Sequence, residues 1–112
     1  MKPAIPLGAL AILLAGPAGA KDTRFWNLTS STVKSLELAP AGASAFGPNQ
    51  TSNDPDGEVD HDERLKITGV ATGGYDARLK LADGRSCTVK GLRIETGKVF
   101  TIEEKDLTAC SR

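Results

Sequence analysis

The residues best suited to chemistry lie close together at positions 52–63, which read S-N-D-P-D-G-E-V-D-H-D-E. This stretch has no lysine or arginine, and its six carboxylates are Asp54, Asp56, Glu58, Asp60, Asp62 and Glu63. Adjacent exposed carboxylates about 6 Å apart repel each other by roughly 0.5–1 kcal/mol per pair in water, and salt screens part of this repulsion. Hard cations bind to several anionic oxygens that converge from a short, flexible segment. The stretch is therefore a candidate metal-binding loop.

The spacing of these residues follows the twelve-residue calcium-binding loop at most positions. Positions three, five, six, eight, nine and twelve of that template are filled by Asp54, Asp56, Gly57, Val59, Asp60 and Glu63. The first position is Ser52, where Asp is the norm, and this weakens the match. Gly-Pro at 47–48 and a strand-like segment at 65–68 flank the loop, so the helices of an EF-hand are not expected. The sequence predicts an acidic loop between β-strands.

The chemistry of the side chains defines the class of ion that such a loop would bind. The preferred ligands are Asp54, Asp56, Asp60 and Glu63, and the alternates are Glu58, Asp62 and His61. Carboxylate oxygens dominate this set, which excludes a Cys/His zinc site and indicates Ca²⁺ or a trivalent lanthanide. Four or five carboxylates carry more negative charge than Ca²⁺ neutralises, which favours the lanthanide. The alternative is a solvated connection without a ligand, as most acidic runs are.

An exposed loop would surround a large ion only in part. Water molecules or a second copy of the chain would then complete the coordination, which leads to the hypothesis of a metal-bridged homodimer. His61, the single histidine, could instead respond to pH near neutrality or remain solvated.

The N-terminal segment at 1–20 has the features of a secretory signal. Lys2 provides the positive start, residues 7–15 form a short apolar core, and Ala-Gly-Ala at 18–20 is a typical cleavage site. The apolar core is far shorter than the roughly 20 residues that span a bilayer. We therefore expect cleavage after Ala20 and a soluble, periplasmic chain at 21–112.

Composition excludes several function classes. Setting Lys2 aside leaves 13 basic and 14 acidic side chains, so the domain is near neutral and is not expected to bind nucleic acid or an anionic membrane. An enzyme is not expected, because a nucleophile needs a base and the single histidine lies in the acidic loop. Two cysteines in an exported chain predict one disulfide, Cys87–Cys110; reactive or metal-binding thiols lack C-x-x-C spacing here.

The remaining pattern is that of β-structure. Strands are expected at 23–28, 32–38, 65–67 and 99–102, with a short edge strand near Phe46 and a helical turn at 103–107. The clearest signal is a hairpin that turns at 83–84. In its first strand Tyr75, Ala77, Leu79 and Leu81 face inward while Asp76, Arg78 and Lys80 face outward. The sequence thus predicts an all-β fold, a small single-domain β-sandwich or open barrel.

Three motifs resemble a family of small secreted β-domain proteins from alphaproteobacteria: F-W-N-L-T-S-S-T-V at 25–33, G-P-N-Q at 47–50 and G-x-Y-D-x-R-L-x-x-x-D-G-R-x-C-x-V at 73–89. The acidic loop is also similar to the D-P-D-x-D-G loops of lanmodulin-type lanthanide binders with two residues missing. These resemblances imply lanthanide binding through exposed carboxylates and contact with a lanmodulin-like periplasmic partner.

Three functions follow from these patterns. The first is a periplasmic carrier that captures a lanthanide in preference to Ca²⁺ at 54–63 and passes it to a partner protein. The second is a metal-free interaction module of the envelope whose sheet face, or a patch at Phe25 and Trp26, binds another protein. The third is a structural domain stabilised by Ca²⁺.

Overall fold

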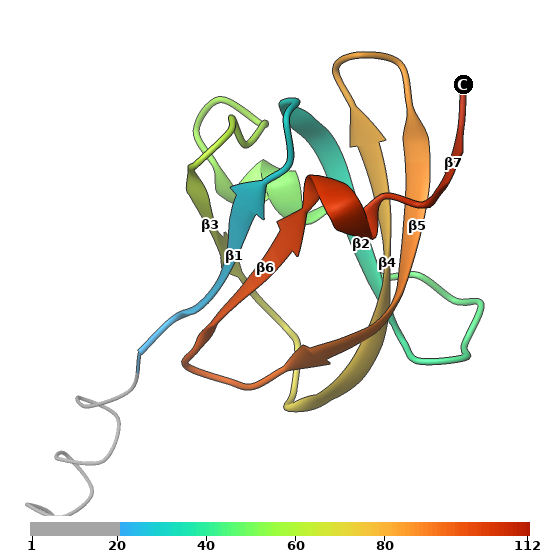
Figure 1. Ribbon diagram of the computed structural model, residues 1–112. Coiled ribbons are helices and arrows are strands. Elements are labelled where there is room, and N and C mark those ends of the chain that lie inside the picture. The colour runs from blue at the N-terminus through green and yellow to red at the C-terminus, as the bar shows by residue number, and fades with distance from the viewer. Residues whose placement is uncertain (1–20) are drawn as a thin grey trace, which may run out of the picture.

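The computed structural model describes residues 21–112, so the predicted signal segment lies outside the described residues. The elements in chain order are β1 (Thr23–Leu28), β2 (Val33–Pro40), η1 (Gln50–Asn53), β3 (Arg64–Ile67), β4 (Gly73–Leu81), β5 (Ser86–Ile94), β6 (Val99–Glu103), η2 (Glu104–Asp106) and β7 (Ala109–Ser111). The strands form one sheet of order β3-β1-β6 and a second of order β2-β4-β5-β7 (Figure 1). This confirms the predicted all-β fold. No helix among the described residues is long and apolar enough to cross a membrane.

The two sheets share one hydrophobic core. Its members are Phe25, Val33, Leu36, Leu38, Val59, Leu65, Ile67, Ala77, Leu79, Leu81, Cys87, Val89, Ile94, Phe100 and Ile102. Most of them lie at alternate strand positions, as expected where one face of a sheet is buried. Full burial of a side chain such as Phe25 contributes about 1.5–3 kcal/mol relative to exposure. Tyr75, which was expected to face inward, is half-buried. In the patch offered as an alternative binding surface, Phe25 is fully buried and Trp26 is half-buried.

The short connection between the first two predicted strands moves the chain from one sheet to the other. β1 pairs antiparallel with β3 and parallel with β6, whereas β2, which follows directly, pairs with β4. The turn at 29–32 therefore bridges the two layers at one end of the domain. The same end receives the acidic loop, because Val59 forms an isolated bridge with Val33.

The β4–β5 hairpin is confirmed, with one exception among its predicted outward residues. Asp76 was expected to face solvent, but it is buried to 7% exposure. The register between β4 and β5 shifts after Tyr75, and this bulge lets the carboxylate of Asp76 accept bonds from the amides of Gly42 (3.0 Å) and Gly91 (3.2 Å). Gly91 has φ +74°, which glycine adopts without strain. These two backbone donors lower the pKa of Asp76 below its usual value.

The edge strand predicted near Phe46 is wrong, since residues 43–49 form no strand. This segment bonds to β2 without forming a strand, and the amide of Gly47 donates to the carbonyl of Leu38 (2.8 Å). The ring of Phe46 instead covers the guanidinium of Arg78, 4.3 Å from its centroid, on the outside of the domain. The structure adds η1, which we did not predict; Asn49 caps it by accepting the amide of Thr51 (3.0 Å).

The disulfide predicted from the cysteine count is present between Cys87 on β5 and Cys110 on β7. These residues are cross-strand partners, so the bond joins the C-terminal strand to the four-stranded sheet. The helical turn predicted at 103–107 is also confirmed as η2.

Candidate metal centre in the acidic loop

The acidic loop is attached to the β1–β2 end of the domain by backbone hydrogen bonds. Val59 and Val33 exchange two bonds of 2.9 Å, and the side chain of Val59 enters the core. Farther along, the amide of Asp62 donates to the carbonyl of Asn27 (2.7 Å), whose own amide donates to the carbonyl of Glu63 (3.0 Å). The centre and the second half of the loop are therefore held by backbone bonds to β1 and β2.

Asn27 organises this attachment, although the sequence patterns did not single it out as a residue of the site. Its side-chain amide donates to the carbonyls of Ser31 (3.0 Å) and Val59 (2.9 Å). Its Oδ1 accepts the amide (3.0 Å) and the hydroxyl (2.7 Å) of Thr29. The residue is fully buried, so these bonds satisfy a polar group that water cannot reach. A signal existed, since Asn27 occupies the same inward alternation as Thr23 and Phe25.

The first half of the loop forms a tight turn. The Oδ2 of Asp54 accepts the amide of Asp56 (2.8 Å), and the amide of Gly57 donates to the carbonyl of Asp54 (3.0 Å). Gly57 has φ +72°, as expected for the sharp turn of the calcium-loop template. The turn at Gly57 and the buried Val59 both match the calcium-loop template, but each also has a structural role in the fold. The side chain of Asp56 projects into solvent.

The centre of the loop faces β2. The carboxylate of Glu58 pairs with the ammonium of Lys34 at 2.6 Å, and this hydrogen bond raises the pKa of Lys34. The Oδ1 of Asp60 accepts the hydroxyl of Thr32 (2.9 Å). Glu58, an alternate ligand, is therefore the loop carboxylate whose charge is balanced by a neighbouring cation.

The second half of the loop forms another turn at residues 60–63. The Oε1 of Glu63 accepts the amide of Asp60 (2.9 Å), whose carbonyl accepts the amide of Glu63 (3.0 Å). Asp62 has φ +70°, a left-handed conformation that Asp tolerates better than most residues. Its Oδ1 accepts the indole N–H of Trp26 (2.9 Å), and the ring of Trp26 stacks on the guanidinium of Arg64 at 4.1 Å.

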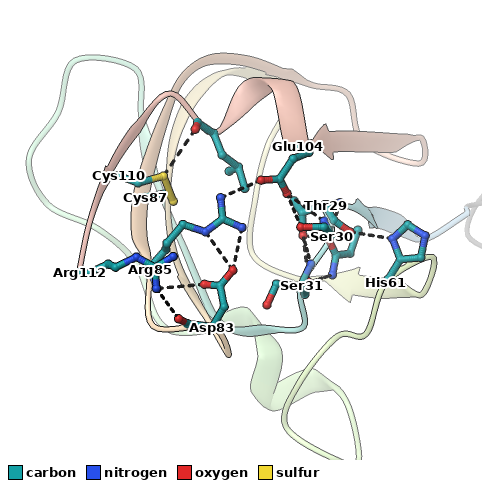
Figure 2. Close-up of polar contacts among 12 residues, drawn as sticks. Thr29, Ser30, Ser31, His61, Asp83, Arg85, Cys87, Glu104, Cys110 and Arg112 are labelled. Atoms are coloured by element: carbon teal, nitrogen blue, oxygen red, sulfur yellow. Dashed lines mark hydrogen bonds and ion pairs between the residues drawn. A yellow bond between two sulfur atoms is a disulfide. The ribbon is translucent and has the colours of Figure 1, made fainter.

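The side chain of His61 lies against the β1–β2 turn (Figure 2). Its Nδ1 lies 2.7 Å from the carbonyl oxygen of Thr29. A carbonyl only accepts hydrogen bonds, so Nδ1 carries the proton, and in the neutral ring Nε2 is the nitrogen with a free lone pair. His61 is exposed, and this second nitrogen is the one that could bind an ion.

The seven predicted ligand residues do not meet at one centre. Among residues 21–112, no group of three or more Asp, Glu, His or Cys side chains is placed to hold a single ion. The four preferred ligands lie instead in two separate turns, Asp54 and Asp56 in the first and Asp60 and Glu63 in the second, and in each turn one carboxylate accepts a backbone amide. Neither turn contains more than two of the preferred ligands.

A second polar network lies beside the loop, on the other side of the β1–β2 turn (Figure 2). Arg85 bonds to Glu104 (2.8 Å) and to Asp83 (Nε to Oδ2, 3.0 Å). The other oxygen of Glu104 accepts the amide and the hydroxyl of Ser30, both at 2.9 Å. The network joins η2, the β4–β5 turn and the β1–β2 turn. Arg112 extends it by donating to the carbonyl of Asp83 (2.7 Å).

We expect this network to make stability depend on pH in the acid range. The bonds from Arg85 and Ser30 lower the pKa of Glu104 from 4.5 to about 2. A depressed folded-state pKa contributes stability above pH 4.5 that is lost as the pH falls toward 2. Glu104→Gln should therefore lower the melting temperature most at pH 6, with a difference from wild type that shrinks as the pH approaches 2. Thermal unfolding followed by circular dichroism measures this.

The control for this prediction is Glu95→Gln, because Glu95 is exposed and its one ion pair within residues 21–112, with Lys98, is 3.7 Å long. A constant difference between wild type and Glu104→Gln across the pH range would contradict the assignment.

Comparisons with protein-family models, with curated proteins and with solved structures find no match to this chain.

Proposed function

We propose that the protein is a periplasmic carrier that captures a hard cation, a lanthanide in preference to Ca²⁺, on the acidic loop and passes it to a partner protein. One observation carries the proposal. Of the six loop carboxylates, Glu58 alone forms an ion pair within the described residues. The other five carboxylates have no ion-pair partner among the described residues, and backbone hydrogen bonds attach the loop to the fold. The negative charge of the loop is therefore concentrated in one place.

The hydrogen bonds of the loop favour a carrier over a domain stabilised by Ca²⁺. Val33 and Asn27 hold the centre and the second half of the loop through bonds to Val59 and to residues 62–63, which gives these parts of the loop a support other than an ion. Two exposed carboxylates from one turn leave most of the coordination sphere of a hard ion to water. Such an ion exchanges readily, which suits delivery to another protein.

The pairing of the ligands also supports a metal-bridged homodimer. The Asp54–Asp56 and Asp60–Glu63 turns supply two carboxylates each, whereas a trivalent ion favours four or more anionic oxygens. Two copies that share an ion would supply them. In its size, its predicted export and its surface acidic site, the chain resembles the periplasmic lanthanide chaperone landiscernin, which implies a lanmodulin-like partner.

Titration with Tb³⁺ in the presence of competing Ca²⁺ tests the proposal directly. The indole of Trp26 bonds to Asp62, so excitation of this single tryptophan should sensitise Tb³⁺ bound at the loop. We expect emission that saturates at low Tb³⁺ and survives a large excess of Ca²⁺. Sedimentation velocity with and without La³⁺ tests the dimer, which should appear only with the metal.

The remaining outcomes are equally informative. If Ca²⁺ displaces Tb³⁺ at equal concentration, the ion is a structural one. If Tb³⁺ shows no sensitised emission and calorimetry shows no heat of binding for either Tb³⁺ or Ca²⁺, the carrier function is rejected. Trp26→Phe is the control, since it should abolish sensitised emission while calorimetry still reports binding.

A further inference from the structure

Two strands that follow each other in sequence leave a seam in the domain. β5 and β6 are joined by residues 95–98 but diverge from this connection and belong to different sheets (Figure 1). β6 pairs only with β1, and β5 has β7 as its outer partner only along residues 86–88. Within the described chain, residues 89–94 and 99–103 therefore each have one strand edge without a strand partner. Such edges present unpaired backbone donors and acceptors to any segment that approaches.

A groove of about 500 Å³ lies between these edges and is lined by residues of both strands and of η2. Its apolar surface comes from Val89, Leu92, Val99 and Phe100. Val99 is 48% exposed and is the one large hydrophobic residue that the described chain leaves exposed. An exposed apolar side chain beside an open strand edge is a site for strand pairing with another chain.

The charges around the groove are unbalanced. Lys90, Arg93 and Lys105 line it, and none of them forms an ion pair or a side-chain hydrogen bond within residues 21–112. The two acids of the groove are already engaged, because Glu103 and Asp106 each bond to the backbone amide of the other in the cap of η2. Asp76, which lies near Lys90, uses both oxygens on backbone amides.

We propose that this groove binds an extended, acidic segment of another polypeptide by strand addition. The open edges of β5 and β6 would supply main-chain hydrogen bonds, Val99 and its apolar neighbours would receive alternate side chains, and the three cations would pair with the carboxylates. β6 is five residues long, so a partner strand of about the same length, roughly 17 Å, fits along it. This site is separate from the acidic loop and does not depend on metal binding.

The geometry favours a peptide over other anions. A nucleic acid or free phosphate would use the cations alone and would leave the strand edges and Val99 without a partner. The domain as a whole is also near neutral, which gives a polyanion little attraction beyond this groove.

The test uses the 21–112 chain and a fluorescent peptide of about eight residues that alternates Val with Asp or Glu. Anisotropy should show saturable binding. A peptide with Lys in place of the acids, and one with Pro in place of Val, should both fail to bind. The proline peptide keeps the charge but lacks half of the backbone donors. Amide exchange measured by NMR should slow at residues 89–93 and 99–102 when the acidic peptide binds.

Matched variants complete the test. K90Q/R93Q/K105Q should weaken peptide binding by about fivefold or more, since each exposed ion pair contributes modestly. K21Q/K66Q/K80Q removes the same charge outside the groove and should leave binding unchanged. The proposal is overturned if the acidic peptide does not bind at millimolar concentration, if the proline peptide binds equally well, if protection maps elsewhere, or if inorganic phosphate or single-stranded DNA displaces the peptide from the cations. None of these results depends on Tb³⁺ uptake.

Discussion

The variant D54N/D56N/D60N/E63Q is expected to lose Tb³⁺ binding by at least about 100-fold, because the affinity of a hard cation depends on the number of charged oxygens it meets. The amide substitutions are chosen to preserve the loop. In wild type, oxygens of Asp54, Asp60 and Glu63 accept hydrogen bonds from Asp56, Thr32 and Asp60 respectively. An Asn or Gln oxygen can accept the same bonds, so the charge changes while the turns remain.

The two pairs of ligands can be tested separately. D54N/D56N removes the first turn's charge and D60N/E63Q removes the second's, so unequal losses identify the pair that binds the ion. D22N/E95Q is the matched control, since Asp22 and Glu95 are exposed and lie outside the loop. Unchanged Tb³⁺ affinity in the fourfold variant would end the carrier proposal.

Replacing Asn27 by Leu should destabilise the domain by about 2–4 kcal/mol, although the two side chains are similar in size. The change removes the four side-chain bonds of Asn27 and leaves the amide of the buried Thr29 without the Oδ1 that accepts it. A buried polar group without a partner costs about 1–3 kcal/mol. Urea denaturation measures the free energy of unfolding.

Asn53→Leu is the control for this prediction. The side chain of Asn53 bonds to the carbonyl of Lys66 (2.9 Å) and to the Oε1 of Gln50 (2.9 Å), which also accepts the amide of Thr68. Asn53 itself is exposed, so water can replace the lost bonds. A similar loss of stability in both variants would show that Asn27 has no special role. Because Asn27 holds both the β1–β2 turn and the loop, Asn27→Leu should also reduce Tb³⁺ uptake in protein that remains folded.

Much of the fold could be predicted from the sequence because it depends on local patterns. Alternation of apolar and polar residues located β1, β3, β4 and β6, and Asp83-Gly84 located the hairpin turn. Two cysteines allow only one pairing, and that pairing is present. The outward orientation predicted for Asp76 was wrong. Asp76 is buried because a bulge, which depends on how β5 aligns with β4, turns its carboxylate toward two amides.

The candidate site was predictable in composition but not in geometry. Sequence identified the acidic loop, the turn at Gly57 and the apolar Val59, because each depends on residues close to one another in the chain. It could not show that Trp26 contacts Asp62, since 36 positions separate them.

The sequence by itself therefore determined most of the strands, the disulfide and the charge of the loop, all of which follow from local periodicity, cysteine count and residue type. Only the tertiary structure decided which partner each carboxylate faces, because Lys34, Thr32 and Trp26 reach the loop from strands and a turn distant in sequence. It also decided that β5 and β6, adjacent in the chain, separate into different sheets and leave open edges. Long-range packing selects among the pairings that local patterns allow.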